Sequence, residues 1–369
     1  MSIIALTNDR QCLRLWCSVL IGAIFGVVVP AVLTLVACGG TTADFDPHAN
    51  ADAFHIEALG RMLFLDPALS ADGKVACASC HQPARLYSDG LPRAIGAFGR
   101  QGVRNAPSLL DVARQHTLFW DGRRARLEEQ ALDPLQNEVE HGLHDEHQLL
   151  DKLRADARYA AAFEAAYGVP MQAATAQQVA QALAAFERTL VSSASPFDRF
   201  LGGQADAMPP AARRGWVVFD QQMHCTRCHA ASAGDGLPPL FTDHQFHSLA
   251  VGFSKIERKL PALTSHLVAL RREGVGLAAE VLRDAELAEL GRFAVTLDPQ
   301  DLAAFKTPGL RNVALTAPYM HDGSVATLAE AVDLEVYGRG AHDTRPVILT
   351  PAERDDVVVF LQALSSEPR

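Results

Sequence analysis

The fold is decided by Cys77-Ala78-Ser79-Cys80-His81 and by its second copy, Cys225-Thr226-Arg227-Cys228-His229. Each copy holds two cysteines on either side of two residues and follows them at once with a histidine. In this pattern two thiols attach across one edge of a porphyrin, and the adjacent imidazole ligates the iron. The two motifs therefore predict two covalently bound haem c groups, with His81 and His229 as iron ligands.

A CxxC pair can also form a redox disulfide or half of a zinc site, or it can arise by chance. A thioredoxin-like motif belongs in a βαβ pattern, which this sequence lacks. A zinc site would leave both histidines as spare ligands. Because the chain has only seven cysteines among 369 residues, two chance copies are improbable.

The composition is that of a globular protein with room for two domains. Hydrophobic residues make up 49% of the chain and charged residues 21%, which excludes a disordered polymer, a collagen-like repeat and a disulfide-dense miniprotein. The formal net charge of −10 argues against a nucleic-acid partner, because phosphate contacts require clustered lysine and arginine.

The N-terminus has the features of an export signal. A nearly unbroken apolar run over residues 15–37 follows Arg10 and Arg14. The run is also long enough to be an uncleaved membrane anchor. The sequence Leu35-Val36-Ala37-Cys38-Gly39 favours cleavage, because it resembles the lipobox at which bacterial lipoproteins are cut and lipidated.

We therefore expect a lipoprotein-type signal peptide over residues 1–37, lipidation of Cys38 and a short tether over residues 38–50. The lipid chains would hold the mature protein at a membrane surface. Gly39 after the cysteine favours the outer membrane. The expected location is the periplasm, with the protein lipid-anchored to the outer membrane.

The spacing of the two haem motifs suggests one haem per domain. We expect an N-terminal haem domain over 51–205 and a C-terminal haem domain over 206–369, with a Ser-, Gly- and Pro-rich linker within 192–210. The Leu-rich, charged stretch 255–290 is expected to be helical, either as a surface insertion or as an element that docks a partner. Strand-like alternation is scarce. The predicted fold class is mainly α, with two cytochrome c-like haem domains and extensive loops.

Three segments carry clear helix signals. Apolar residues recur at near-helical spacing over 145–167. Thr175 and Gln178 form a capping-box pattern ahead of an apolar face. Thr350 as N-cap and Glu353 three residues later begin another helix near the C-terminus.

The sequence resembles the bacterial di-haem cytochrome c peroxidase/MauG family over roughly residues 55–365. Its most specific segments are Phe119-Trp120-Asp121-Gly122-Arg123, Leu127-Glu128-Glu129-Gln130-Ala131 and Leu310-Arg311-Asn312-Val313-Ala314-Leu315-Thr316-Ala317-Pro318-Tyr319-Met320-His321-Asp322-Gly323. The resemblance implies that the N-terminal haem is the peroxidatic site and that the C-terminal haem relays electrons.

By the same resemblance, three residues take catalytic roles. Gln130 and Glu140 match the family's glutamine and glutamate on the distal side of the peroxidatic haem, opposite His81. A carboxylate held there can move a proton from the inner to the leaving oxygen of peroxide. Trp120 matches the tryptophan between the two haems.

The resemblance also implies a calcium ion between the domains. Asn105, Thr316 and Pro318 match the positions that hold it. Calcium accepts side-chain amide and backbone carbonyl oxygens together with water, so the site requires few carboxylates.

Two departures from the family pattern are informative. Many of the family's peroxidases place a second histidine sixteen residues after the first haem histidine, where it blocks the iron until the enzyme is reduced; this chain has Ala97 there. We therefore expect an open peroxidatic haem that needs no reductive activation, as in MauG.

The second departure concerns the sixth ligand of the C-terminal haem. The family's methionine position holds Glu335 here, and a MauG-like tyrosine would be Tyr337 if two residues are inserted. Tyr337 is the tentative prediction, with Met320 and Glu335 as alternatives. Met223 replaces a tryptophan that MauG has before its second haem motif, so the likeness to MauG is partial.

The expected function is a di-haem c-type cytochrome-c peroxidase that reduces hydrogen peroxide to water. Its electrons would come from a small cytochrome c or cupredoxin. An alternative is a MauG-like enzyme that uses peroxide to oxidise side chains of a partner protein. A third, less favoured hypothesis is a non-catalytic di-haem electron carrier, which would have two six-coordinate haems.

Overall fold

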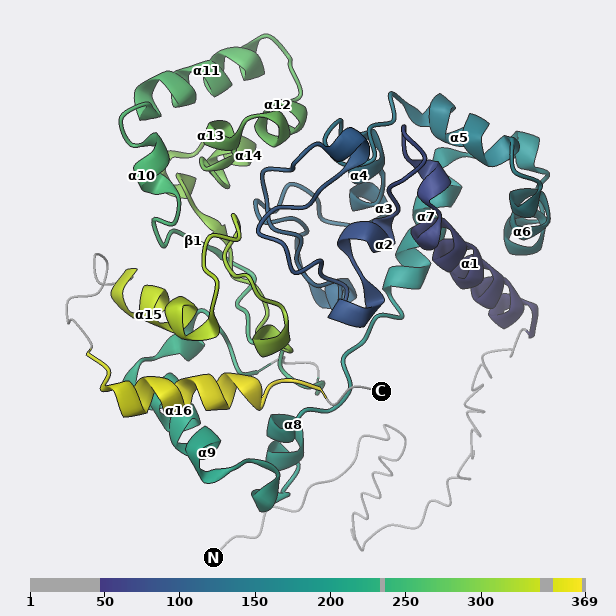
Figure 1. Ribbon diagram of the computed structural model, residues 1–369. Coiled ribbons are helices and arrows are strands. Elements are labelled where there is room, and N and C mark those ends of the chain that lie inside the picture. The colour runs from purple at the N-terminus through teal and green to yellow at the C-terminus, as the bar shows by residue number, and fades with distance from the viewer. Residues whose placement is uncertain (1–46, 233–235, 339–347, 367–369) are drawn as a thin grey trace, which may run out of the picture. The chain divides into compact units, whose positions relative to one another are not determined.

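The computed structural model describes residues 47–232, 236–338 and 348–366, with side chains from residue 52 onward. The predicted signal peptide, Cys38 and most of the tether lie outside these residues. Helices dominate the described chain, which confirms the predicted mainly α class (Figure 1). No helix in this part of the chain is both long enough and apolar enough to cross a membrane.

The elements follow one another along the chain as short helices joined by long loops. The helices of eight or more residues are α1 (Pro47–Leu65), α5 (Glu146–Arg154), α6 (Ala157–Tyr167), α7 (Ala176–Glu187), α9 (Pro210–Val217), α11 (Leu260–Arg272), α15 (Leu328–Gly338) and α16 (Pro351–Gln362). The shorter ones are α2 (Cys77–Cys80), α3 (Leu127–Gln130), α4 (Leu132–Gln136), α8 (Pro196–Leu201), α10 (Phe253–Ile256), α12 (Leu277–Arg283), α13 (Ala285–Ala288) and α14 (Phe293–Thr296). The strands β1 (Phe246–His247) and β2 (Phe305–Lys306) pair antiparallel.

A first hydrophobic core lies within residues 59–190, where α1 packs along α7 (Figure 1). Phe64, Phe163 and Leu183 are almost fully buried in it. Gly60 permits the close approach of the two helices, because a Cβ there would clash with the carbonyl oxygen of Ala182.

A second core lies within residues 197–364, where α9 packs along α16. It is built around aromatic rings, with Phe197 lying 5.2 Å from Trp216 and 5.6 Å from Phe360 between ring centroids. Gly215 plays the part that Gly60 plays in the first core, since a Cβ there would clash with the carbonyl oxygen of Asp356. Each half is thus held together by a pair of helices that cross at a glycine.

The capping boxes predicted at Thr175 and Thr350 are confirmed, and each hydroxyl accepts the backbone N–H of the residue three positions on. The predicted helical stretch 145–167 is two helices, because Asp156 caps α6 with its own side chain and so ends α5 just before it. The expected linker is wrong in part. The stretch 192–210 contains α8, whose Phe197 is 1% exposed in the second core.

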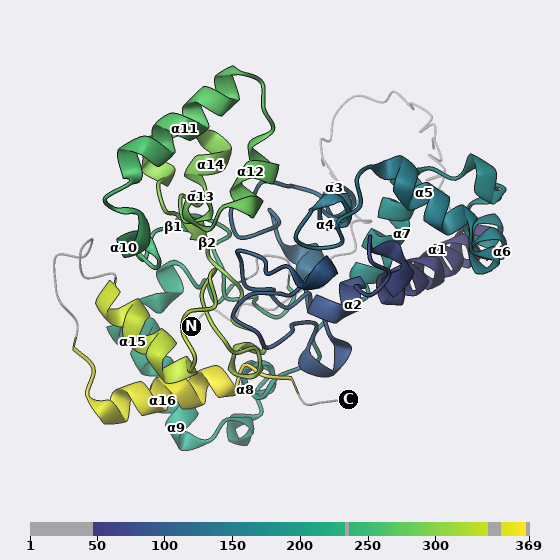
Figure 2. The same cartoon turned by 45° about the horizontal axis from the view of Figure 1, so that its top comes forward.

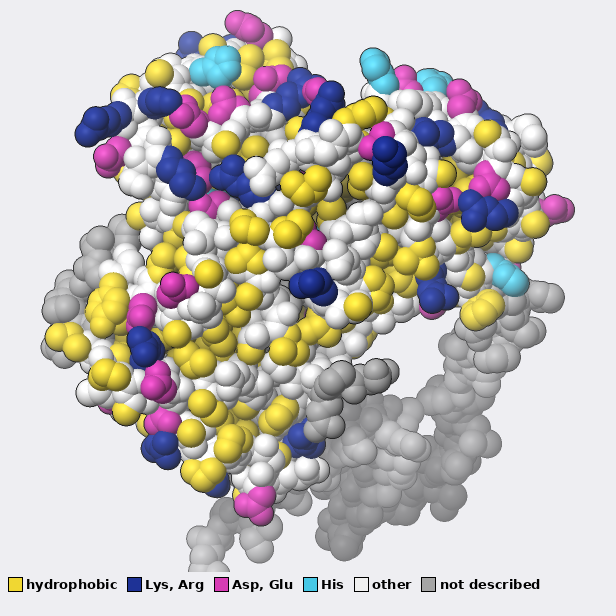
Figure 3. Space-filling model, in the orientation of Figure 1, with side chains coloured by type: hydrophobic (Ala, Val, Ile, Leu, Met, Phe, Trp, Pro, Cys, Tyr) yellow, Lys and Arg dark blue, Asp and Glu magenta, His cyan; other side chains and the backbone are white. Residues whose placement is uncertain are grey.

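The stretch 255–290 is helical, as expected, and α10 to α14 enclose a third core (Figure 2). Ile256, Leu267 and Leu290 are fully buried there. On the face shown in Figure 3, basic and acidic side chains alternate over the region of these helices. This face therefore gives no support to a docking role based on one sign of charge.

Residues 104–128 and 305–329 form two copies of one local structure, each residue matching the one 201 positions later. The pattern Pro-x-Leu-x-[Asp/Asn]-Val-Ala starts at Pro107 and again at Pro308. Equivalent features are the 3₁₀ turns Val112–Arg114 and Val313–Leu315 and the antiparallel bridges Leu118–Arg124 and Tyr319–Val325. The halves are therefore related by an internal repeat, which the sequence reasoning missed.

Candidate functional site

One cavity of about 840 Å³ is lined by residues of both haem motifs. Cys80 and His81 contribute from the first motif, and Cys225, Cys228 and His229 from the second. Its size is in the range of protein sites for large organic ligands. The four motif cysteines form no disulfide.

The two motif histidines are held in the same way. His81 Nδ1 lies 3.0 Å from the Tyr87 carbonyl oxygen, and His229 Nδ1 lies 2.9 Å from the Phe241 carbonyl oxygen. A carbonyl can only accept, so each Nδ1 carries the proton and each Nε2 keeps its lone pair. A hydrogen bond from the other ring nitrogen is the usual support of a metal-ligating histidine.

Both supporting carbonyls come from residues with a left-handed backbone, Tyr87 at φ 60° and Phe241 at φ 59°. This conformation is uncommon for non-glycine residues and marks positions that the surrounding structure fixes. Burial also lowers the pKa of His81, which favours the neutral imidazole that can bind iron. The cavity, the cysteine thiols that line it and its two oriented imidazoles therefore fit two haem c groups.

Gln130 and Glu140, the predicted distal residues, both line the cavity. Gln130 is the last residue of α3, and Glu140 lies in the loop after α4. The Asn137 side-chain amide donates to a Glu140 carboxylate oxygen and fixes its position. Burial raises the pKa of Glu140 above its ordinary value of 4.5, although nearby Arg123 opposes the shift. A carboxylate with a raised pKa exchanges protons more readily near neutral pH.

The loop 94–102, which lacks the family's blocking histidine, is docked on the segment that carries Glu140. Ala97 is fully buried, and its backbone N–H donates to the Glu140 carbonyl oxygen at 2.7 Å. Gly96 is required at the contact, because a Cβ there would clash with the carbonyl oxygens of Val139 and Glu140. The Arg100 guanidinium, at the end of the loop, forms an ion pair with the Glu138 carboxylate at 3.1 Å.

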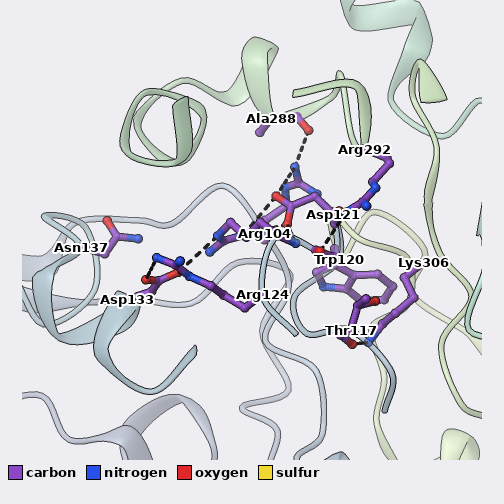
Figure 4. A network of polar contacts seen from close by, with 12 residues as sticks. Arg104, Thr117, Trp120, Asp121, Arg124, Asp133, Asn137, Ala288, Arg292 and Lys306 are labelled. Atoms are coloured by element: carbon purple, nitrogen blue, oxygen red, sulfur yellow. Dashed lines mark hydrogen bonds and ion pairs between the residues drawn. The ribbon is translucent and has the colours of Figure 1, made fainter. Parts of the chain in front are cut away.

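Trp120 also lines the cavity, and its indole N–H donates to the Asn105 carbonyl oxygen at 3.0 Å. Figure 4 shows Lys306 beside its ring. The turn after Trp120 is fixed by Arg292, whose guanidinium donates to the Asp121 and Gly122 carbonyl oxygens at 3.0 and 2.8 Å. These contacts fix the aromatic ring at a defined place beside the cavity.

The structure gives Tyr337 no support as an iron ligand. Tyr337 is 60% exposed and is not among the residues that line the cavity. Glu335 and Met320, the two alternatives, both line it.

The predicted calcium residues Asn105, Thr316 and Pro318 all line the cavity. Asn105 lies against the segment that carries Thr316 and Pro318, because its backbone N–H donates to the His321 carbonyl oxygen at 2.9 Å. Asn105 is 8% exposed and its side-chain N–H donates to the Leu91 carbonyl oxygen at 2.9 Å, so its side-chain oxygen stays available as a ligand.

The comparisons with known proteins agree with this site. The model of the di-haem cytochrome c peroxidase family matches residues 55–206. The cytochrome-c peroxidase IdrP1 of Pseudomonas sp. strain SCT is 33% identical over 334 residues, which cover 87% of this chain and 84% of the relative. This chain belongs to the di-haem cytochrome c peroxidase family.

Further similarities fall within the same family. The methylamine utilization protein MauG of Methylorubrum extorquens is 33% identical over 330 residues, covering 87% of this chain and 82% of the relative. Among solved structures, a MauG-like protein associated with microbial copper homeostasis has a TM-score of 0.67 at 30% identity, covering 87% of this chain and 92% of that chain. The di-haem peroxidase BthA of Burkholderia thailandensis has a TM-score of 0.66 at 27% identity, covering 87% of each chain. The protein is accordingly an oxidoreductase that carries two haem c groups.

Sequence reasoning assigned no role to a charged cluster beside Asn105, in which Glu289, His321 and Asp322 are buried and Lys255 is half-exposed. His321 Nε2 lies 2.7 Å from a Glu289 carboxylate oxygen, and Lys255 Nζ bridges Glu289 at 3.1 Å and Asp322 at 2.7 Å. Lys255 and Glu289 come from the stretch 255–290, which gives that stretch a structural role at the site. A signal existed for His321 and Asp322, since they are the repeat equivalents of Trp120 and Asp121.

Proposed function

We propose that this protein reduces hydrogen peroxide to water on the side of the cavity formed by Gln130 and Glu140, opposite His81. The observation that carries the proposal is the docked loop 94–102, which has no histidine that could reach the iron and which fixes the Glu140 segment instead. When bound, a haem with one protein ligand supplies an open iron position for peroxide, and the second haem supplies one-electron relay.

The residues of the chain divide the remaining work. Glu140 takes a proton from the inner oxygen of peroxide and returns it to the leaving oxygen, which departs as water when the O–O bond breaks. The Gln130 amide donates a hydrogen bond that orients the peroxide. Two electrons from a small cytochrome c or cupredoxin and two protons complete the balance, giving two water molecules. Trp120 is the aromatic group that couples the two halves.

The test is peroxide turnover by the holoprotein with reduced cytochrome c as donor. Glu140→Gln should lower kcat/KM for peroxide by about 10²- to 10⁴-fold, the usual contribution of a positioned acid–base group. The matched control is Glu164→Gln, because Glu164 is an exposed residue of α6 outside the cavity lining. Equal rates in the two variants would contradict the proposal.

A second candidate is a MauG-like oxidation of side chains in a partner protein. The open site implied by Ala97 favours it, whereas Met223 in place of a tryptophan weakens it. A peroxide-dependent covalent change in a co-expressed exported partner protein, seen by mass spectrometry, would support this function. Peroxide turnover that depends only on a small electron donor would count against it.

We further propose a calcium ion bound by Asn105, Thr316 and Pro318. The support is that the Asn105 segment and the segment before His321 are hydrogen-bonded together, with a side-chain amide oxygen and backbone carbonyls as the donor set. Removal of calcium with a chelator should lower the melting temperature of the holoprotein, because a ligand bound only to the folded state stabilises it. An unchanged melting temperature would argue against the ion.

The location we propose is the periplasm, with lipidated Cys38 holding the protein at the outer membrane. The support is the lipobox-like sequence around Cys38. Mass spectrometry of the mature N-terminus should find a diacylated cysteine. Cys38→Ala should release the protein from the membrane fraction, and an unprocessed N-terminus in the wild type would contradict the assignment.

A further inference from the structure

Lys306 lies at the position that is equivalent, in the internal repeat, to the predicted calcium ligand Asn105. The equivalence extends to the other two ligands of that site. The matching sets are Asn105, Thr316 and Pro318 on one side and Lys306, Gln115 and Thr117 on the other.

Reciprocal backbone hydrogen bonds join the two copies of the repeat. The Asn105 N–H donates to the His321 carbonyl oxygen at 2.9 Å, and the Lys306 N–H donates to the Trp120 carbonyl oxygen at 2.8 Å. Trp120 and His321 are themselves equivalent positions. Each copy therefore donates one backbone hydrogen bond to the other copy and accepts the equivalent bond from it. Such reciprocity is the mark of an approximate two-fold axis.

The Lys306 ammonium group fills the place of a cation in this symmetric arrangement. Its Nζ donates to the Thr117 carbonyl oxygen at 2.6 Å and to Gln115 Oε1 at 3.3 Å. Figure 4 shows the side chain running beside Trp120 to Thr117. Both acceptors are neutral oxygens, of the kinds that calcium accepts: a side-chain amide and a backbone carbonyl.

The Asp121 carboxylate attracts the Lys306 ammonium group through space, but the direct contacts of that group are with neutral oxygens. Within the described parts of the chain, no carboxylate forms an ion pair with this ammonium group. Burial lowers the pKa of Lys306 to about 8, because desolvation disfavours the charged form. Lys306 also lines the cavity, where the propionates of a bound haem would add further negative charge.

We propose that Lys306 is a tethered cation, whose ammonium group occupies the oxygen cage equivalent to the calcium site and supplies there the positive charge that calcium supplies on the other side. The proposal rests on the calcium site proposed above. One half of the junction would then use a metal ion and the other half an amino group that chelators cannot remove. A fixed positive charge beside a haem stabilises its reduced form and raises its potential.

The first experiment counts calcium in the purified holoprotein. Lys306→Asn removes the ammonium group and restores the amide that Asn105 supplies on the other side, with Gln115 and the Thr117 carbonyl still in place. We expect one calcium ion per chain in the wild type and two in Lys306→Asn. The matched control is Lys259→Asn, because Lys259 is exposed and pairs with Glu286; it should bind one.

The second experiment measures the potentials of both haems by spectroelectrochemistry. Lys306→Met should lower the potential of one haem, and Lys306→Arg, which keeps the charge, should restore it. Lys306→Asn should recover the wild-type potential with calcium present and lose it with a chelator. Lys259→Met should leave both potentials unchanged.

The outcomes separate this proposal from the calcium site itself. One ion in both the wild type and Lys306→Asn would overturn the equivalence of the two cages. Unchanged potentials in Lys306→Met would overturn the role of Lys306 as a cation, whatever calcium does. No ion in the wild type together with one in Lys306→Asn would contradict the calcium site proposed at Asn105 while supporting the cage at Lys306.

Discussion

Single hydrogen bonds decide the chemistry of the site at the residue scale. The Tyr87 carbonyl fixes the tautomer of His81, and the Asn137 amide fixes the carboxylate of Glu140. The first contact prepares a ligand for iron, and the second prepares an acid–base group for peroxide.

The pH dependence of peroxide turnover follows from the raised pKa of Glu140. Glu140 acts as a base, so it must lose its proton first, and kcat/KM should rise with pH through a pKa above 4.5 and then level off. Steady-state rates from about pH 4 to about pH 8 measure this rising part (the acid limb) of the pH profile. A limb at or below 4.5, or one that persists in Glu140→Gln, would contradict the assignment.

Much of this detail could be predicted from the sequence, because the motifs are short and local. The haem cysteines and histidines and the capping boxes at Thr175 and Thr350 each depend on residues within a few positions. The carbonyls of Tyr87 and Phe241 could not be predicted, since their roles depend on a left-handed backbone that the residue types do not favour.

At the scale of elements, the loop 94–102 and the segment 137–142 act as one unit. The contact depends on Gly96, where a side chain would meet two carbonyl oxygens of the Glu140 segment. The loop has no histidine to offer the iron. Its buried backbone instead holds the segment that carries Glu140 in place.

Gly96→Ala should therefore disturb Glu140 without touching either haem motif. We expect a lower rate of peroxide turnover, by about 10-fold or more, with unchanged haem content. The matched control is Gly102→Ala, because a Cβ at Gly102 would lie at an ordinary contact distance of 3.6 Å from the Ala94 carbonyl oxygen. Equal loss in both variants would show that the loop as a whole, and not this contact, is responsible.

Helix α15 carries Glu335 and Tyr337, two of the three residues considered as the sixth ligand of the C-terminal haem. Side chains two positions apart in an α-helix point in directions that differ by about 200° around the helix axis. Glu335 and Tyr337 therefore lie on nearly opposite faces of α15. Glu335 lines the cavity and Tyr337 is exposed. Matching the sequence motif alone could not show this difference, because it does not fix which helix face each residue occupies.

The absorption spectra of variants in α15 test which residue ligates the iron. If Glu335 is the ligand, Glu335→Gln should change the bands of the oxidised C-terminal haem, because a carboxylate bound to iron would be a hard ligand for the ferric state. Tyr337→Phe should leave the spectrum unchanged. The opposite pair of results would restore Tyr337 as the ligand, and a change only in Met320→Leu would assign it to Met320.

At the scale of the molecule, the described part of the chain consists of two similar halves around one cavity, with a third helical group beside it. Sequence reasoning anticipated the mainly α class, since helical periodicity is visible in each half. It missed the internal repeat, although Pro107 to Ala113 and Pro308 to Ala314 carry the same pattern, because short matches far apart acquire meaning only when the chain brings them together. It also predicted a linker where α8 packs. The Ser, Gly and Pro residues of that stretch are typical of a linker, whereas the burial of Phe197 depends on contacts with distant parts of the chain.

The central claim is an open peroxidatic haem on His81 in the resting, fully oxidised protein. Electron paramagnetic resonance of the oxidised holoprotein tests it most directly. We expect a high-spin ferric signal from the haem on His81 beside the signal of the C-terminal haem. Low-spin signals alone, with no high-spin ferric component, would show that a sixth protein ligand closes the site and would contradict the claim.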